Sequence, residues 1–414
     1  MSAGATRPMA TRGVLGGFLV LNVVSGTVAG AMQLMVPLFA LQLLATTAQI
    51  GMIRGISGLG LLLLVIPAGF LVDHFGARRL FLLGSLVGTV LTFAIPLSQI
   101  PLHLLALQGA LGLFASLKST ALTSSFFSRI REMGIARAGW YKGSMSIGLS
   151  FLGPLLAAAL TQALAPEQIF RLLAVMTLLP IALVFFFHEE ARPAARQSGL
   201  TAGIRAQLSD LRALLANNPL VLPLLTEAAA GGCFAAFTAF IVPIVVLSLH
   251  LPGGFASVLT SLEGGAFILT VFLAGGLIRH LSPLQLYLLA VTVTLGALIG
   301  LGVPGEVFRV AAFSVVLGVG LGLFNLVTAM RQGLIKGEKG KAVSLFGASI
   351  GIGLCLGPLL GGQVGAHFYP SAAFIAFVPV FLALAALAVR EARIHGPALA
   401  LAFRGGPVGE AAEA

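Results

Sequence analysis

Residues 69–79 read Gly69-Phe70-Leu71-Val72-Asp73-His74-Phe75-Gly76-Ala77-Arg78-Arg79, a short charged turn between two apolar runs. Gly69 lies one helical turn before Asp73, and a glycine in that position lets another helix approach closely. Gly76 permits a tight reversal of the chain. Arg78 and Arg79 would hold the next helix at the anionic inner face of a membrane. The pattern therefore predicts two membrane-spanning helices joined by this turn.

The rest of the chain has the composition of a membrane protein. Of its 414 residues, 58% are hydrophobic and 9% are charged, and the mean hydropathy is +1.05. A soluble protein carries about 25% charged residues. Uncharged apolar runs such as 59–71, 80–95, 172–187 and 372–389 approach, with their flanks, the ~20 residues that span a bilayer. We therefore expect an all-α membrane protein.

The apolar runs predict twelve spans. They lie near residues 14–44, 47–71, 79–97, 102–126, 143–164, 170–188, 219–248, 256–278, 284–303, 307–329, 342–366 and 372–389. With the amino terminus in the cytoplasm, 20 of the 24 Lys and Arg residues fall on the cytoplasmic side, which fixes both termini there. The Ala-, Leu- and Arg-rich composition is typical of a GC-rich bacterial genome, so we expect a multi-pass protein of the bacterial inner membrane.

One long internal connection divides the chain. We predict an N-terminal six-helix bundle over 1–190, a cytoplasmic linker over 191–218, and a C-terminal six-helix bundle with a cytoplasmic tail over 219–414. Within the linker, apolar residues at helical spacing predict an amphipathic helix at the membrane surface; they are Leu200, Ile204, Leu208, Leu211 and Leu215.

The two halves repeat each other. The segment around Gly153-Pro154 matches the segment around Gly357-Pro358, 204 residues later, and Gly69 aligns with Gly275 at an offset of 206. Chance similarity between glycine-rich segments would not keep the offset nearly constant. Two parallel six-helix repeats joined by a cytoplasmic linker are the plan of a carrier with its binding site between the halves.

The turn at 69–79 resembles the cytoplasmic loop motif of the major facilitator superfamily, G-x-x-x-D-x-x-G-x-R-[RK], and the resemblance extends over essentially the whole chain. It implies a twelve-helix secondary transporter of the bacterial type, built from two pseudo-symmetric bundles. In that family the carboxylate corresponding to Asp73 belongs to an inner latch that holds one access state. The second copy, from Gly275, has Arg279 in place of Asp73, so the latch is expected only in the first half.

Glycine-proline motifs give the resemblance more detail. Gly353, Gly357, Pro358, Gly361 and Gly362 fit a pattern from the fifth helix of the family's proton-coupled exporters, although here they lie in the eleventh span. The fifth span carries a weaker version at Gly153 and Pro154. Close helix packing explains such residues equally well. The family's exporters often carry an Arg in the fourth helix just before a Gln-Gly pair, and here Leu105 occupies that position before Gln108-Gly109. The first span also lacks acidic residues. Any proton-coupling group must therefore lie elsewhere.

Three ionisable residues fall inside predicted spans, where each should face a cavity or a partner. Glu263 lies in the eighth span and Glu227 in the seventh, and either carboxyl could bind and release a proton during transport. Lys118, in a polar stretch of the fourth span, could attract an anionic solute, pair with Glu227, or extend to the membrane interface. A static partner would explain either glutamate without a role in transport.

The resemblance also implies that the first, fourth, seventh and tenth helices line the cavity. The polar residues on those spans are therefore candidate solute contacts, among them Asn22, Gln33 and Asn325. Each of them is also compatible with helix packing alone.

The sequence contains no motif for nucleotide binding or for the common metal sites. There is no phosphate-binding G-x-x-x-x-G-K-[ST] loop, no H-E-x-x-H and no paired C-x-x-C. We therefore expect no cofactor, no metal site, no enzyme activity and no nucleic-acid partner. The expected partners are a small-molecule substrate, protons and the lipid bilayer, and the chain is expected to act as a monomer.

The function predicted from these observations is secondary active transport of a small organic solute, most simply export by proton antiport. Proton-coupled uptake of a small, possibly anionic solute is the alternative. A membrane sensor that transports nothing but uses the same scaffold is a further alternative.

Overall fold

The computed structural model describes residues 8–128, 138–187, 218–333 and 339–403. These residues form helices and connecting turns, with no strand among them. The predicted amphipathic helix of the linker and the end of the cytoplasmic tail lie outside the described residues.

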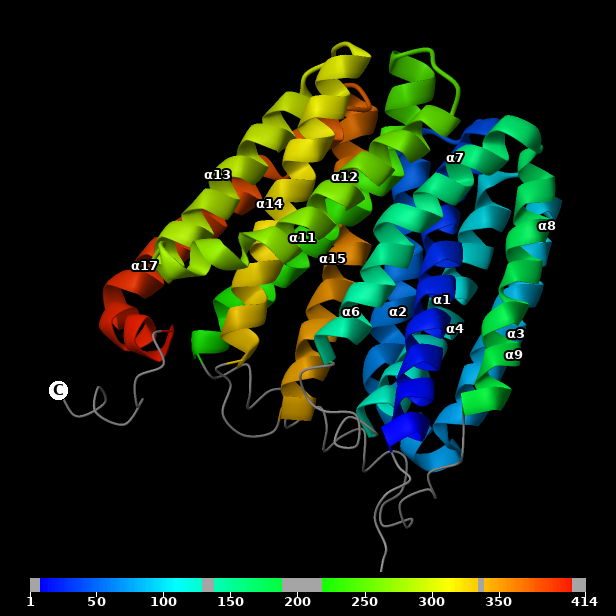
Figure 1. Cartoon of the computed structure of the whole chain (residues 1–414). Coiled ribbons are helices and arrows are strands. Elements are labelled where there is room, and N and C mark those ends of the chain that lie inside the picture. Colours follow the sequence, from blue (N-terminus) through cyan, green and yellow to red (C-terminus); the bar gives the residue numbers. More distant parts are fainter. Residues whose placement is uncertain (1–7, 129–137, 188–217, 334–338, 404–414) are drawn as a thin grey trace, which may run out of the picture. The chain divides into compact units, whose positions relative to one another are not determined.

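The helices follow the predicted spans closely (Figure 1). In the first half they are α1 (Pro8–Gln42), α2 (Thr47–Phe75), α3 (Ala77–Ala94), η1 (Ile95–Leu97), α4 (Pro101–Ser128), α6 (Ala138–Ser146), η3 (Ile147–Leu152), α7 (Gly153–Ala163), α8 (Pro166–Met176) and α9 (Leu178–Phe187). In the second half they are α11 (Asn218–Pro243), η4 (Ile244–Ser248), α12 (Gly254–Leu273), η5 (Ala274–Arg279), α13 (Pro283–Gly302), α14 (Val307–Gly333), α15 (Lys339–His367), α16 (Ala372–Ile375) and α17 (Val378–Phe403).

Eleven helical stretches of the described chain are long and apolar enough to cross a membrane. The remaining predicted span, near 170–188, is occupied by α8 and α9, which are separated at Thr177. The Thr177 hydroxyl donates to Ala174 O and also contacts the hydroxyl of Thr89 on α3. The interruption divides this span into two short helices, and the predicted twelve-span architecture is confirmed.

Proline and capping residues determine where several helices begin. Pro101, Pro166 and Pro283 occupy the first position of α4, α8 and α13, where a missing N–H costs nothing. At the start of α13, Ser282 Oγ accepts from the N–H of Gln285 at 3.3 Å, and Gln285 Oε1 accepts from the N–H of Ser282 at 2.9 Å. This reciprocal capping box fixes the start of that span.

The chain forms two compact units. Unit 1 contains residues 1–45, 56–207 and 253–261, and unit 2 contains 46–55, 208–252 and 262–414. Each unit therefore includes the first turns of one helix whose remainder belongs to the other. In unit 2 the start of α2 packs on α15, where a Cβ added to Gly51 would lie 2.4 Å from Pro358 O.

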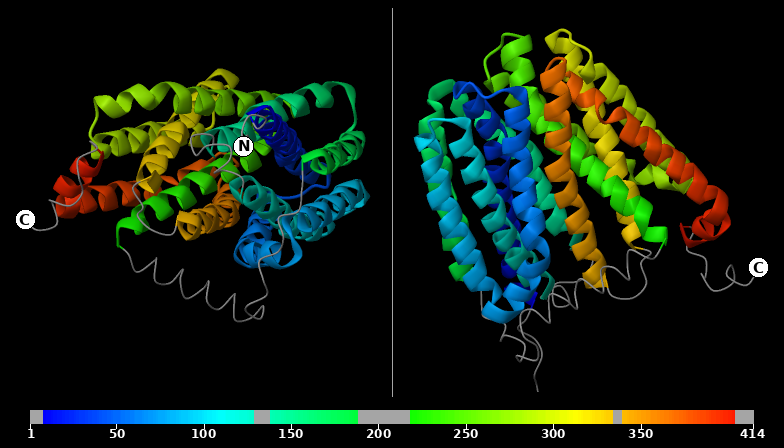
Figure 2. Two further views of the ribbon diagram at one scale, coloured as in Figure 1. Left: turned by 60° about the horizontal axis from the view of Figure 1, so that its bottom comes forward. Right: turned by 180° about the vertical axis from the view of Figure 1, so that it is seen from behind.

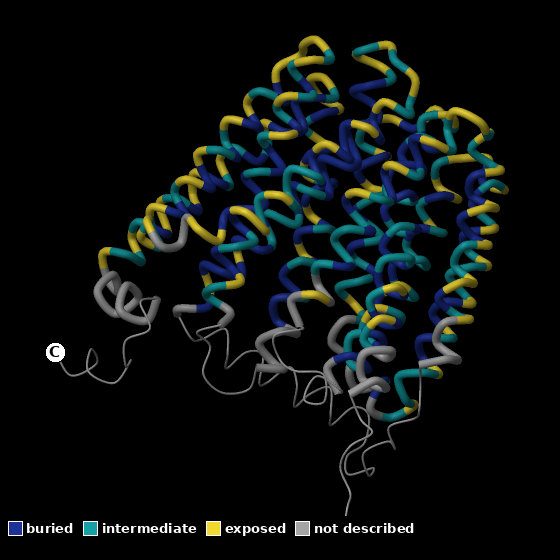
Figure 3. Tube along the Cα trace, in the orientation of Figure 1, coloured by how far each residue is buried: buried dark blue, intermediate teal, exposed yellow. Residues whose placement is uncertain are grey.

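Within unit 1, α1 packs against α6, η3, α7, α8 and α9, and α3 pairs with α4. Within unit 2, α11 pairs with α15, and α13 packs against α14 and α17. Figure 2 shows these pairs from two further directions. Most helices carry buried residues along one side and exposed residues along the other (Figure 3).

Apolar clusters hold each unit together. In unit 1 a cluster from α1, α2, α3 and α4 includes Phe18 and Phe126, whose rings meet edge to face at 5.7 Å. In unit 2 Leu220 and Leu224 of α11 meet Leu345 and Phe346 of α15. These clusters lie near one end of each unit's helices.

Candidate functional site

Glu263 is the most enclosed of the predicted in-span charges. It lies on α12 with 1% of its surface exposed, while Val258, Leu262 and Leu269 mark the exposed face of the same helix. Its Oε2 has no hydrogen-bond partner among the described residues. Buried polar atoms are normally satisfied, so an orphaned carboxyl oxygen calls for an explanation.

The backbone around Glu263 is tightly packed. A Cβ added to Gly318 of α14 would lie 2.1 Å from Glu263 O and 3.0 Å from the Cβ of Ala266. Only glycine allows α12 and α14 to meet so closely. The buried thiol of Cys233, on α11, lies within electrostatic range of the same carboxyl. Glu263 is therefore buried where α12 meets α14, with Cys233 of α11 nearby.

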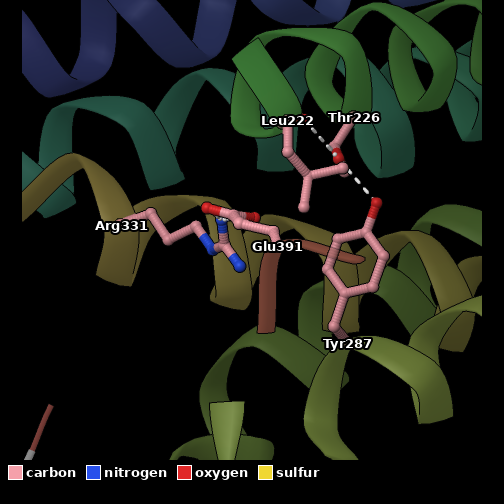
Figure 4. A network of polar contacts seen from close by, with 5 residues as sticks. All are labelled: Leu222, Thr226, Tyr287, Arg331 and Glu391. Atoms are coloured by element: carbon pink, nitrogen blue, oxygen red, sulfur yellow. Dashed lines mark hydrogen bonds and ion pairs between the residues drawn. The ribbon is translucent and has the colours of Figure 1, made fainter. Parts of the chain in front are cut away.

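Glu227 lies on α11 with 8% of its surface exposed, and it interacts with a partner inside the protein. Its neighbour Thr226 is fully buried. The Thr226 hydroxyl donates to Leu222 O at 2.8 Å, and it forms a second hydrogen bond of 2.8 Å with the Tyr287 hydroxyl of α13 (Figure 4). Thr226 and Tyr287 thus link α11 to α13 beside Glu227.

Sequence reasoning missed a second link in unit 2. Arg331, in the last turn of α14, donates through Nη1 to both carboxylate oxygens of Glu391 on α17, at 3.1 and 2.9 Å (Figure 4). Arg331 was counted only among the basic residues that set topology. Because Glu391 lies 60 positions further along the chain, no spacing pattern could have shown the pairing.

Aromatic rings connect these two polar links. The ring of Tyr287 meets that of Phe324 on α14 edge to face at 5.5 Å, and Phe324 lies 5.4 Å from Phe381 of α17. The polar and aromatic contacts together tie α11, α13, α14 and α17 to one another. Edge-to-face pairs of this kind add to the stability that burial provides.

In unit 1, α1 carries a row of uncharged polar side chains. Asn22, which is 1% exposed, donates through Nδ2 to Ser144 Oγ of α6 at 3.2 Å. Ser25 follows at 7% exposure, and Gln33 lies two turns further along the same face. Neither Ser25 Oγ nor Gln33 Oε1 has a partner within the part of the chain that the structure describes.

Lys118 of α4 turns towards α3, where its Nζ lies 5.7 Å from the ring centre of Phe81. An ammonium over an aromatic face is a stabilising arrangement. Lys118 belongs to unit 1 and Glu227 to unit 2, so the suggested pairing between them stays a prediction.

The structure adds Arg54 to the charges inside the spans. Arg54 is not among the 20 basic residues that the topology places on the cytoplasmic side, and it lies beyond the first two turns of α2. Arg54 interacts within the protein, and it follows Gly51 on the part of α2 that belongs to unit 2. Because Arg54 lies close to the start of the predicted span at 47–71, the sequence did not mark it as an internal charge.

The turn at 69–79 forms the junction of α2 and α3. Gly76 adopts a φ of +88° and separates the two helices, as a residue without a Cβ can. Arg78 interacts with another group, whereas Arg79 is exposed. Gly69 and Asp73 lie in α2, and the arrangement of the Asp73 side chain is outside the described part of the structure, so the latch stays a prediction.

The glycine-proline motifs lie at equivalent contacts in the two units. In unit 1 a Cβ on Gly153 would lie 2.7 Å from the Cα of Gly30. In unit 2 a Cβ on Gly357 would lie 2.6 Å from the Cα of Gly232, and one on Gly353 would lie 2.0 Å from Ala228 O. Both motifs bring a helix against the first helix of its own repeat.

The remaining predicted residues lie nearby in the same helices. Pro154 and Pro358 are buried inside their spans, and Gly361 packs against the ring of Phe240. Gly362 lies against Gly51 in unit 2. Asn325 is half-buried on α14, and its carbonyl accepts from the Thr328 hydroxyl at 3.2 Å. No group of three or more His, Cys, Asp or Glu residues in the described ranges could hold a metal ion.

Known proteins with similar sequences and folds are transporters. A model of the Major Facilitator Superfamily matches residues 18–330. The multidrug resistance protein MdtG of Dickeya zeae (strain Ech586) is 24% identical over 322 residues, which cover 76% of this chain and 77% of that protein.

Solved structures extend the likeness to nearly the whole chain. The nucleoside transporter NupG superposes with a TM-score of 0.68 at 14% identity, over 95% of this chain and 98% of that one. A bacterial homologue of the human lysosomal transporter Spinster gives a TM-score of 0.66 at 13% identity, over 97% and 98%. At these identities the structural likeness concerns the fold.

Proposed function

This chain belongs to the Major Facilitator Superfamily of secondary transporters, and we propose that it exports a small amphiphilic organic solute in exchange for protons. It would act by alternating access, as a monomer in the bacterial inner membrane with both termini in the cytoplasm. The halves 1–190 and 219–414 would rock about the linker, which is the usual behaviour of parallel six-helix repeats.

The proposal of proton coupling rests on Glu263. The residue is 1% exposed and its Oε2 has no partner in the described residues. The backbone of α14 at Gly318 lies against the main-chain carbonyl of the same residue. An ionisable residue retained at this cost inside a membrane is a functional candidate by default.

Similarity to MdtG supports the direction of transport. MdtG is described as a multidrug resistance protein, and resistance is most directly achieved by export. The excess of basic residues on one side of the predicted spans supports the cytoplasmic termini. Asp73, Arg78 and Arg79 would then lie at the cytoplasmic turn and control the inner opening of the carrier.

Everted membrane vesicles test the proposal. Their lumen is acidified by respiration, a pH-sensitive dye reports the gradient, and a panel of small amphiphilic solutes is added. Export by antiport predicts that a transported solute releases protons from the lumen. Solute-dependent proton uptake into intact cells would instead indicate symport and would contradict export.

Two glutamine variants make the test specific to Glu263. Glu263→Gln should abolish solute-dependent proton release. Glu306→Gln removes an exposed carboxyl between α13 and α14 and should leave the release unchanged. Equal release from wild type and Glu263→Gln would show that the coupling group lies elsewhere.

A further inference from the structure

The two repeats can be compared contact by contact within each unit. In unit 1 a Cβ added to Gly112 of α4 would collide with Ser57 O of α2, and in unit 2 one added to Gly318 of α14 would collide with Glu263 O of α12. Both residues of the second pair lie 206 positions after those of the first, which is the offset found in the sequence. The two crossings are therefore equivalent, and Glu263 occupies the position at which unit 1 carries an uncharged serine.

Lys118 marks a second position at which the repeats differ in charge. Its Nζ lies 5.7 Å from the ring centre of Phe81. At the same offset, unit 2 has Phe324 in place of Lys118 and Tyr287 in place of Phe81, and these two rings meet edge to face at 5.5 Å. An aromatic ring therefore satisfies the packing at this position, so the scaffold does not require a lysine there.

The charge of Lys118 is not neutralised by a neighbouring side chain. Among the described residues Lys118 forms no ion pair, and the group that its ammonium faces is the ring of Phe81. An ammonium within a membrane span is costly unless a counter-charge or water accompanies it, and residues retained at such a cost are usually functional. A cation that packing does not require and that lacks a counter-charge indicates a ligand that supplies one.

The ammonium can be approached from the exposed side of α4. Ala115 and Ser119 are exposed, and Lys118, three residues after Ala115 and next to Ser119, is half-buried. Residues three and four apart lie on the same side of a helix. The adjoining Phe114 and Leu117 are apolar. A ligand on this side would therefore meet a single positive charge among apolar side chains.

From these observations we propose that Lys118 is an anion-binding residue, whose ammonium pairs with the carboxylate or phosphate group of an amphiphilic anion. Such a pair is a charge-assisted hydrogen bond, which is stronger than a neutral one. The inference rests on the proposed transport function where the anion is the exported solute, and it then adds the charge of the substrate. An anionic phospholipid offers the same chemistry, and the experiment separates the two sources.

Equilibrium dialysis of the purified full-length chain in a neutral, lipid-free detergent tests the proposal. The two probes, naphthaleneacetate and naphthaleneacetamide, have nearly the same shape and differ in charge. We expect wild type to bind the anion about tenfold more tightly than the amide, because hydrogen bonds to charged groups are stronger than those between neutral groups.

Lys118→Phe introduces the residue that unit 2 carries in the equivalent contact. It should abolish the preference for the anion and leave thermal stability unchanged or higher, because the new ring can pack against Phe81. Lys118→Gln is a second neutral variant, which gives a reading even if Lys118→Phe does not fold. Lys118→Arg keeps the charge and should keep the preference. Arg171→Gln removes an exposed charge from the same unit and should alter nothing.

A second arm identifies the source of the anion. Native mass spectrometry counts the molecules of phosphatidylglycerol and of zwitterionic phosphatidylcholine that wild type and Lys118→Gln retain. A preference for naphthaleneacetate that depends on Lys118 assigns the site to the solute. Selective loss of phosphatidylglycerol from Lys118→Gln, without a preference in dialysis, assigns the site to a phospholipid.

Equal retention of both anions by wild type and the neutral variants, or retention of neither, would overturn the proposal. Neither arm involves a proton gradient. Solute-driven proton release from vesicles that persists alongside such a result would leave the transport proposal standing. Anion binding that depends on Lys118 without any proton release would instead leave the anion site standing and remove the antiport.

Discussion

Arg331 Nη1 donates to both carboxylate oxygens of Glu391, and this single ion pair joins the last turn of α14 to α17. Only 11% of the arginine side chain and 14% of the glutamate side chain are exposed. The pair is therefore mostly screened from water. With the Thr226–Tyr287 bond and the ring of Phe324, it gives unit 2 a continuous set of contacts across four helices.

Glu391→Ala should destabilise the protein by about 3 kcal/mol, because it leaves a mostly buried guanidinium without its counter-charge. Thermal or denaturant unfolding of the purified chain in detergent measures the change. Replacing both residues by Met should restore most of the loss, since the desolvated charge is then removed together with its partner. A double variant as unstable as Glu391→Ala would show that the charge is not the cause.

Tyr287→Phe should cost about 0.5–1.5 kcal/mol, the net value of one neutral hydrogen bond. The ring contact with Phe324 is retained, and the Thr226 hydroxyl keeps its bond to Leu222 O. A double-mutant cycle with Thr226→Val isolates the bond. Additive single effects would mean that the two hydroxyls do not interact.

Gly357→Ala should destabilise unit 2 by about 1–3 kcal/mol, the usual cost of overpacking, because its new methyl group would collide with the backbone at Gly232. Gly153→Ala should destabilise unit 1 by a similar amount, because its methyl group would collide with the backbone at Gly30 in the corresponding contact. Gly296→Ala is the control: a Cβ on α13 there meets nothing within 4 Å, so stability should stay equal or rise.

Gly76→Ala should cost about 1–3 kcal/mol through backbone strain alone. A φ of +88° is unfavourable for any residue with a Cβ, although no neighbouring atom lies in the way. Gly88→Ala provides the comparison, since Gly88 has open surroundings in the middle of α3 and should accept alanine without loss. Unfolding curves for both variants separate strain from crowding.

Much of the fold followed from local pattern. Apolar runs without charges predicted the spans because a bilayer requires long uninterrupted stretches, and the repeat around Gly153 and Gly357 predicted equivalent packing in the two halves. The break at Thr177 between α8 and α9 was not predicted, because the apolar run continues on both sides of it, although Pro180 in the first turn of α9 is a residue that favours the start of a helix.

The candidate site was less predictable. Glu263 was found because a carboxyl in an apolar run is conspicuous, but its enclosure depends on Gly318, which is far away in sequence. The separation of Arg331 and Glu391 along the chain also kept their pairing from being predicted. Arg54 lay too close to the predicted end of its span to be recognised as an internal charge.

The most direct measurement compares net export with solute exchange in liposomes containing the purified chain, either wild type or Glu263→Gln. Exchange of labelled for unlabelled solute needs no net proton movement, whereas accumulation against a gradient does. We expect Glu263→Gln to retain exchange and to lose accumulation driven by the pH difference. Full accumulation by this variant would contradict the assignment of the coupling proton to Glu263.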